Sequence, residues 1–221
     1  MKQALLINPN SSHETTVMMV EIARANSPDD LSIIGATAKR APRMIVTPEQ
    51  LAGAAAEVIE IGRREAATVS GIVIGAFGDP GLQALRKEVA VPVVGLCEAS
   101  MLEAAAGGRR FGVATVTPDL AAAIEGRAHD LGVRALYTGI RLTNGDPVAL
   151  AADATRLEES LGKAAAECFE IDRAEAVIIG GGPLGQAAIG LAKLFARPIV
   201  APIPAAIRQL GRMMRGSCSA V

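Results

Sequence analysis

The chain holds few cysteine or histidine side chains that could act as nucleophiles, bases or metal ligands. Cys97, Cys168 and Cys218 are widely and irregularly spaced, and the two histidines, His13 and His129, fall in different segments. Such spacing matches neither a disulfide framework nor a CxxC-type metal site. We therefore expect no zinc site built from these side chains.

Two short polar segments are stronger candidates, and their chemistry is ligand binding. N-P-N-S-S at residues 8–12 and T-V-T-P at residues 115–118 each follow an apolar run and precede a helical pattern. Helix N-termini offer free backbone N–H groups to anions, which favours a ligand with a carboxylate or another planar polar group. The alternative is that Ser12 and Thr117 only cap the helices that follow. The candidate binding residues in these segments are Asn8, Asn10, Ser11, Thr115, Thr117 and Pro118.

Two glycine-rich segments follow later apolar runs, at residues 75–82 and 180–184. Glycine lets the backbone adopt positive φ and approach a ligand closely, although both segments can also be tight turns only. Asp79 is the one acidic side chain in them, and we interpret it as a helix cap rather than a base in a cleft. No GxGxxG or GxxxxGK[ST] pattern follows a strand, which disfavours dinucleotides and nucleoside triphosphates. Phe77, Gly78 and Gly182 complete the binding candidates.

Short apolar strands alternate with amphipathic helices along the whole chain. Strands are predicted at residues 4–7, 31–36, 71–75, 91–96, 111–114, 135–142, 176–179 and 198–201. Helices are predicted near residues 14–24, 48–66, 83–89, 119–131, 147–169, 184–195 and 205–215. Strands that are apolar throughout and rich in β-branched residues are typical of parallel sheets with helices on both faces. The prediction is an α/β fold.

The order of elements occurs twice. Three pairs of landmarks share nearly one spacing: Asn8 with Thr115 (107 positions), Ala76 with Gly181 (105) and Pro92 with Pro198 (106). We interpret this as two pseudo-symmetric α/β lobes, residues 1–100 and 101–200, with residues 201–221 forming a C-terminal helix that packs back on the first lobe. Ligands of such folds bind beyond the carboxyl ends of the strands, so a site is expected in the cleft between the lobes.

Composition excludes several classes of protein. Of 221 residues, 50% are hydrophobic and 20% are charged, which is incompatible with a disordered chain. The formal net charge is −1 and only one Tyr, four Phe and no Trp occur, which argues against nucleic-acid binding. No apolar run approaches the roughly 20 residues of a membrane helix, and no signal-peptide pattern is seen. We expect a cytoplasmic protein without nucleic-acid or membrane partners.

Five motifs, in order along almost the whole chain, carry a resemblance to a known family. They are INPNSS at residues 7–12, GAFGDPGL at 75–82, PVVGLCEAS at 92–100, FGVATVTP at 111–118 and IIGGGPL at 178–184. Together they resemble the hydantoin racemase branch of the aspartate/glutamate racemase superfamily. The resemblance implies two α/β lobes and chemistry at a carbon next to a carbonyl, with neither metal nor pyridoxal phosphate. It also suggests a homo-oligomer and a small substrate with a carboxylate or hydantoin-like group.

Racemases of this family use two cysteines, one per lobe, which remove and supply a proton on opposite faces of the substrate carbon. A thiol suits this role because its pKa, about 8.5 when unperturbed, can be lowered toward neutral pH. The resemblance places the two cysteines at Ala76 and Gly181, so both are missing here. An acidic residue usual in the family near residues 201–205 is also absent. Asp79 and Cys97 are the weak candidates for a replacement base.

Three interpretations remain open from the sequence. The chain is an enzyme of this superfamily with altered catalytic residues, of racemase, isomerase or lyase type. Alternatively, it is a racemase that has lost its catalytic residues and keeps substrate binding, or a non-catalytic binding protein on the same scaffold. The fold alone does not separate them.

Overall fold

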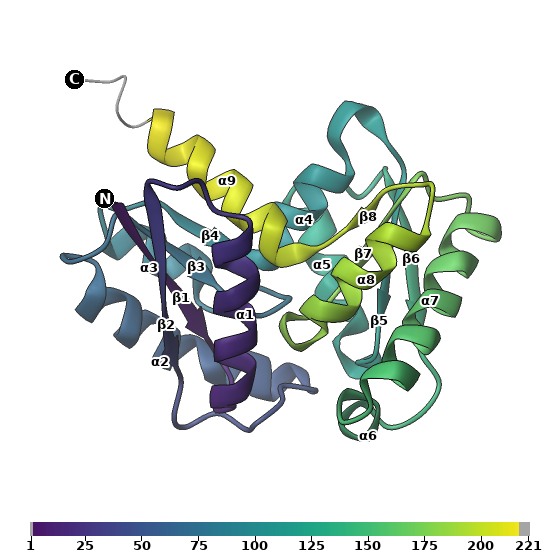
Figure 1. The fold of residues 1–221 in the computed structure, drawn as a ribbon, viewed down its shortest axis with the longest axis horizontal. Helices are drawn as coiled ribbons and strands as arrows, with labels where there is room; N and C mark the ends of the chain where they lie inside the picture. The colour runs from purple at the N-terminus through teal and green to yellow at the C-terminus, as the bar shows by residue number, and fades with distance from the viewer. Residues whose placement is uncertain (1, 217–221) are drawn as a thin grey trace.

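The computed structural model describes residues 2–216. Cys218 and the last positions of the predicted C-terminal segment lie outside the described residues. Two four-stranded sheets form, and every strand pair in them is parallel. The predicted α/β class with two lobes is confirmed (Figure 1).

The two sheets have equivalent strand orders, β2-β1-β3-β4 and β6-β5-β7-β8, and no strand crosses from one to the other. The first sheet consists of β1 (Lys2–Asn8), β2 (Leu31–Thr37), β3 (Gly71–Ile74) and β4 (Val93–Gly95). The second consists of β5 (Phe111–Thr115), β6 (Tyr137–Leu142), β7 (Ala176–Ile179) and β8 (Ile199–Val200). We call the part of the chain around each sheet the first and second lobe. The central strands β1, β3, β5 and β7 are almost wholly buried, which explains their continuous apolar runs.

Helices cover both faces of each sheet. In the first lobe they are α1 (His13–Ala25), α2 (Pro48–Glu65), α3 (Leu82–Glu88) and α4 (Leu96–Ala104). In the second they are α5 (Ala121–Asp130), α6 (Pro147–Ala151), α7 (Ala154–Glu170) and α8 (Gly185–Leu194), with short 3-10 turns at η1 (Ala106–Gly108), η2 (Pro118–Leu120) and η3 (Gly182–Leu184). The last helix, α9 (Pro202–Gly216), packs against α4, α1 and β3. None of the described helices is long and apolar enough to cross a membrane.

Two elements differ from the sequence prediction. The strand predicted at 91–96 ends at Gly95, and α4 begins at once, so Cys97 lies in the first turn of a helix rather than at the end of a strand. The single helix predicted at 147–169 is two helices, because the side chain of Asp153 accepts a hydrogen bond from the Arg156 N–H and begins α7 anew.

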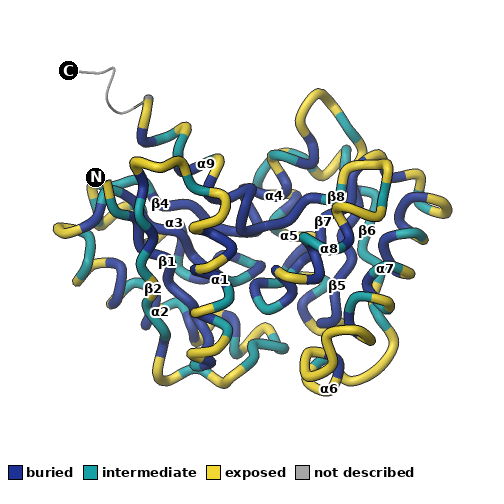
Figure 2. The backbone as a smooth tube through the Cα atoms, viewed as in Figure 1, coloured by how far each residue is buried: buried dark blue, intermediate teal, exposed yellow. Residues whose placement is uncertain are grey.

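The lobes share one hydrophobic core. A central cluster joins buried residues of the first sheet, such as Leu6 and Val73, with residues of the second, such as Phe111 and Ile178. Separate clusters lie on the outer faces, under α2 and α3 in the first lobe and under α7 and α8 in the second. Figure 2 shows buried segments in both lobes and in α4, which lies between them. The central cluster therefore fixes the two lobes against each other by apolar packing.

Candidate functional site

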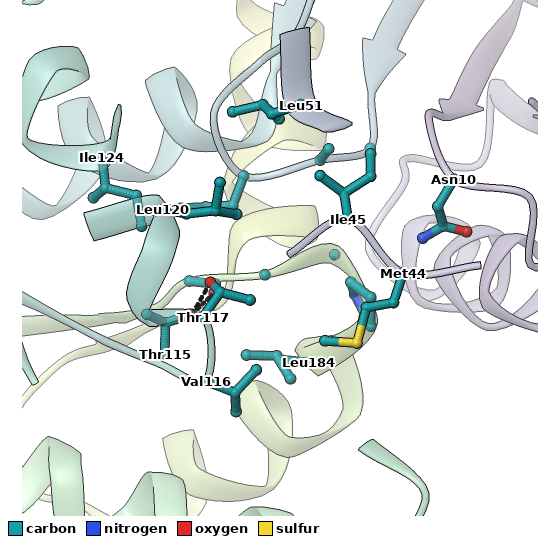
Figure 3. A pocket seen from close by; sticks show the side chains of 17 residues that line it. Asn10, Met44, Ile45, Leu51, Thr115, Val116, Thr117, Leu120, Ile124 and Leu184 are labelled. Atoms are coloured by element: carbon teal, nitrogen blue, oxygen red, sulfur yellow. Dashed lines mark hydrogen bonds between the residues drawn. The ribbon is translucent and has the colours of Figure 1, made fainter. Parts of the chain in front are cut away.

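A narrow pocket lies where the turns after β1, β3, β5 and β7 meet, at the carboxyl ends of the strands (Figure 3). Its free volume is about 40 Å³. Its lining comes from both lobes and consists of Asn10, Met44, Ile45, Leu51, Gly75, Ala76, Phe77, Thr115, Val116, Thr117, Leu120, Ile124, Gly180, Gly181, Gly182, Pro183 and Leu184.

The pocket brings together seven of the thirteen residues singled out in the sequence. These are Asn10, Ala76, Phe77, Thr115, Thr117, Gly181 and Gly182. The other six are not part of its lining: Asn8, Ser11, Gly78, Asp79, Cys97 and Pro118. The two positions at which the resemblance places cysteines therefore border the same cavity from opposite lobes.

The turn after β1 is organised by a buried asparagine. Asn8 Nδ2 donates to Asn10 Oδ1 and to the Ser12 carbonyl oxygen, both at 2.9 Å. Ser12 caps α1, since its hydroxyl accepts from the Thr15 N–H at 3.2 Å. Asn8 and Ser12 thus hold the turn, while the Nδ2 group of Asn10 donates to no described residue. Asn10 is the side chain of this turn that remains available to a ligand.

The turn after β5 differs from its counterpart in the use of its hydroxyls. Thr115 Oγ1 donates to the Gly180 carbonyl oxygen at 2.6 Å and ties β5 to the glycine turn after β7. Thr117 is the N-cap residue of η2, but its side chain makes no capping hydrogen bond. Its Oγ1 lies 3.4 Å from Thr115 Oγ1, at the edge of hydrogen-bond distance, and lines the pocket. The capping interpretation therefore holds for Ser12 and fails for Thr117.

The pocket is floored by backbone of both lobes in close contact. A Cβ at Gly182 would overlap the carbonyl oxygen of Gly75, so only glycine fits there. Gly181 has an extended backbone (φ 160°), which any residue can adopt. A Cβ at Gly181 would lie 2.9 Å from Cγ of Leu184, so a larger residue there needs that side chain to move.

Asp79 lies in the turn that carries Ala76, but its carboxylate serves another element. Oδ1 accepts from the Cys97 N–H and Oδ2 from the Glu98 N–H, both at 2.8 Å, so Asp79 caps α4 rather than α3, the helix that follows it. Arg127 of the second lobe lies 3.3 Å from Oδ2. Burial raises the pKa of Asp79 from 3.8 to about 6, although the two N–H donors and Arg127 act in the opposite direction.

Neither described cysteine is placed as a base. Cys97 is fully buried outside the pocket lining, and burial raises the pKa of its thiol well above the ordinary value. Burial likewise raises the pKa of Cys168 to about 12. A usable thiolate requires the opposite shift. Among the described residues, no group of three or more His, Cys, Asp or Glu side chains is arranged to hold a metal ion.

The apolar wall of the pocket was not predicted from the sequence. Met44 and Ile45 enter it from the segment between β2 and α2, and Leu51 from the first turns of α2. Leu120 and Ile124 line it from the second lobe. The available signal was the run M-I-V at 44–46, the one stretch of large apolar side chains in the connection 38–47. With this wall included, no Asp, Glu, His, Cys, Lys or Arg is among the lining residues.

The comparisons with known proteins agree with this architecture. The sequence model described as Asp/Glu/hydantoin racemase matches residues 5–210, nearly the whole chain. This chain belongs to the Asp/Glu/hydantoin racemase family. Within the family it is 31% identical to a hydantoin racemase of Rhizobium meliloti over 210 residues, which covers 92% of this chain and 85% of the relative.

Two further known proteins show a similar likeness. A hydantoin racemase of Pseudomonas sp. (strain NS671) is 28% identical over 204 residues, covering 92% of this chain and 82% of the relative. The structure of an allantoin racemase from Klebsiella pneumoniae superposes with a TM-score of 0.93 at 25% identity, covering 98% of this chain and 89% of that one. The motif-based assignment to this family is thus confirmed.

Proposed function

We propose that this family member binds a small carbonyl compound, hydantoin-like or carboxylated, in the pocket between the lobes, and that it exchanges no proton there through a pair of thiols. The observation that carries the proposal is the lining itself. It combines hydrogen-bonding groups with apolar side chains, and none of its side chains is ionisable. On the family resemblance we propose in addition a cytoplasmic homo-oligomer that needs no cofactor.

The polar groups of the lining supply donors for carbonyl or carboxylate oxygens. Asn10 contributes a free amide and Thr117 a hydroxyl that caps no helix. The backbone N–H groups of Ala76, Phe77 and Gly181 have no hydrogen-bond partner in the described part of the chain. A donor without a prior partner binds a ligand oxygen without having to break an existing hydrogen bond. Such donors suit the oxygen atoms of a hydantoin ring or a carboxylate.

The same lining opposes two-base racemisation. Removing a proton next to a carbonyl needs a base with a pKa near the working pH, and the amide of Asn10 and the hydroxyl of Thr117 are not such bases. With Ala76 and Gly181 at the two positions assigned to thiols, no side chain on either face can accept the proton. Binding without turnover is the function that this chemistry supports best.

A second candidate is an enzyme with altered machinery, and Asp79 is the observation in its favour. Its carboxyl has a pKa raised to about 6, and it belongs to the turn that carries Ala76 and Phe77. To act, however, it would have to leave the α4 N-terminus and turn toward the pocket.

One experiment separates the two functions. The protein is titrated with 5-benzylhydantoin by calorimetry, and the loss of the C5 proton signal is followed by NMR in D₂O at pH 7 beside a protein-free control. The binding function predicts saturable heat and no exchange above the control rate. Exchange that is accelerated by the wild-type protein and abolished by Asp79→Asn establishes the enzyme instead. Absence of any binding to hydantoins, amino acids or substituted malonates removes both.

A further inference from the structure

The pocket is too small in this structure for the ligands proposed above. Its free volume of about 40 Å³ compares with about 10–15 Å³ for a single bound water, so it holds a few waters at most. A substituted hydantoin is far larger. Entry of such a ligand therefore requires one wall of the pocket to move.

Most of the wall belongs to the packed interior and cannot yield easily. Val116, Leu120, Ile124 and Leu184 are each at most 5% exposed and sit in the two core clusters that contain the second lobe's residues. Phe77 is likewise buried in the central cluster. Moving any of these side chains opens a void in a close-packed core. The half-buried apolar side chains Met44 and Ile45 are different, because they come from an irregular connection.

This connection, residues 38–47, which we call the strap, is tied to the first lobe at its two ends. Glu57 of α2 accepts the N–H groups of residues 39 and 40 at 2.7 and 2.9 Å. The far end is held by a capping box between Thr47 and Gln50. In between, the Pro42 carbonyl oxygen accepts from the Ser11 N–H at 3.0 Å. These anchors lie outside the pocket.

The tip of the strap, residues 43–45, has a much weaker attachment. No backbone N–H of these three residues donates to any other described residue. The side-chain ion pair between Arg43 and Glu14 joins two groups that are both 74% exposed, so it adds little to stability. The remaining contacts of the tip are apolar, since Ile45 packs on the central cluster and Met44 on the outer cluster of the second lobe. In Figure 3 Met44 and Ile45 reach into the pocket between Asn10 and Thr117.

We propose that Met44 and Ile45 gate the pocket and determine the largest substituent it admits. A segment with two firm anchors and a three-residue tip can swing without unfolding either lobe. When the tip swings out, the contacts of Ile45 with the central cluster and of Met44 with the second lobe break, and the cavity opens on that side. When it returns, its two apolar side chains close over the ligand's substituent. The ligand part of this inference rests on the proposed function, whereas the gating itself does not.

Access to the pocket can be measured without any natural ligand. In a Cys218→Ser background, Ala76→Cys introduces a thiol on the pocket lining, while Cys97 and Cys168 are buried. Alkylation rates are measured by mass spectrometry with a small reagent, iodoacetamide, and a bulky one, N-phenylmaleimide. The added substitution Met44→Ala should raise the rate with the bulky reagent about tenfold and the rate with the small reagent much less, because the bulky reagent needs the wider opening of the gate.

Two further variants serve as controls. Val46→Ala truncates a half-buried strap side chain that does not line the pocket, so both rates should stay at the parent value. Met44→Leu keeps the volume of the gate and should behave like the parent. Unchanged rates in Met44→Ala, or an equal rise in Val46→Ala, overturn the proposal.

A ligand arm then tests the specificity claim. Affinities of the parent and of Met44→Ala, both with Ala76 intact, are compared for 5-methylhydantoin and 5-benzylhydantoin. The variant should gain affinity for the benzyl compound relative to the methyl compound. An unchanged ratio contradicts a role in selecting the substituent. If neither compound binds either protein, the proposed function fails, and the gating stands or falls on the alkylation rates alone.

Discussion

At the level of single residues, substitution of Thr117 distinguishes a role in ligand binding from a role in helix capping. Its hydroxyl lines the pocket and caps nothing, so Thr117→Val should weaken binding of 5-benzylhydantoin by about 1–2 kcal/mol and leave the melting temperature nearly unchanged. Ser12→Ala is the matched control, since Ser12 caps α1 and lies outside the pocket. It should lower stability by about 0.5–2 kcal/mol without affecting binding. Calorimetry measures the binding and thermal melting the stability of both variants. The assignment is contradicted if Thr117→Val loses stability and Ser12→Ala loses affinity.

Asp79 makes a prediction about pH. Because burial raises the pKa of Asp79 from 3.8 to about 6, the native protein holds this proton more tightly than the unfolded chain does. Its stabilising contribution is therefore full below about pH 4 and is lost as the pH rises through about 6. Asp79→Asn removes this dependence, and asparagine tolerates the positive φ of 54° at this position. We compare the free energy of unfolding of the wild type with that of the variant at each pH. The wild-type value minus the variant value should be larger at pH 4 than at pH 7 by about 1–3 kcal/mol. Equal differences in urea unfolding at the two pH values would refute the raised pKa.

At the scale of the element, the glycine turn after β7 depends on contact between the lobes. Gly182→Ala would drive a methyl group into the Gly75 carbonyl oxygen, and backbone cannot yield as a flexible side chain can. We expect a loss of about 1–3 kcal/mol in stability by chemical denaturation. Gly53→Ala on α2 is the matched control, because a Cβ there meets nothing within 4 Å. It should stabilise the protein by up to about 1 kcal/mol. Equal effects of the two substitutions would show that the lobes do not touch at this point.

The elements that the sequence predicts well are those with local signals. The apolar runs predict the strands, and Thr47 as N-cap residue predicts where α2 begins. Helix α4 has no such local signal, because its N-cap residue is Gly95, which has no side chain to cap the helix. The cap is Asp79, far away in the chain, so the helix is begun by a tertiary contact. Local propensity cannot report such a contact.

At the scale of the whole molecule, the repeated spacing of motifs was enough to predict two equivalent lobes with a cleft between them. It also placed Ala76 and Gly181 in corresponding turns, and both line the pocket. It could not show that the pocket is half closed by Met44, whose contact with the second lobe depends on how the lobes are oriented. Nor could it show that the side chains of Asp79 and Cys97 are buried in the packed interior. Orientation and burial are properties of the assembled fold.

The shared core predicts that the two lobes unfold together. The central cluster takes buried residues from both sheets, so neither lobe keeps its core when the other is lost. Tyr137, the one tyrosine of a chain without tryptophan, lies in the second lobe and reports on it by fluorescence, while far-ultraviolet circular dichroism reports on both. The two urea transitions should coincide. Separate midpoints would show that the lobes fold independently.

We propose that the pocket keeps the binding site of a racemase but lacks the acid and the base. The most direct measurement is hydrogen exchange at C5 of 5-benzylhydantoin in D₂O at pH 7, followed by NMR and chiral chromatography, for wild type and for Ala76→Cys with Gly181→Cys. The double variant requires Leu184 to shift, so its melting curve is recorded first. We predict no exchange above the protein-free rate for wild type, and acceleration of about 100-fold or more with racemisation for the double variant. A wild-type protein that exchanges the proton, or a folded double variant that binds the hydantoin without exchanging it, would contradict the account.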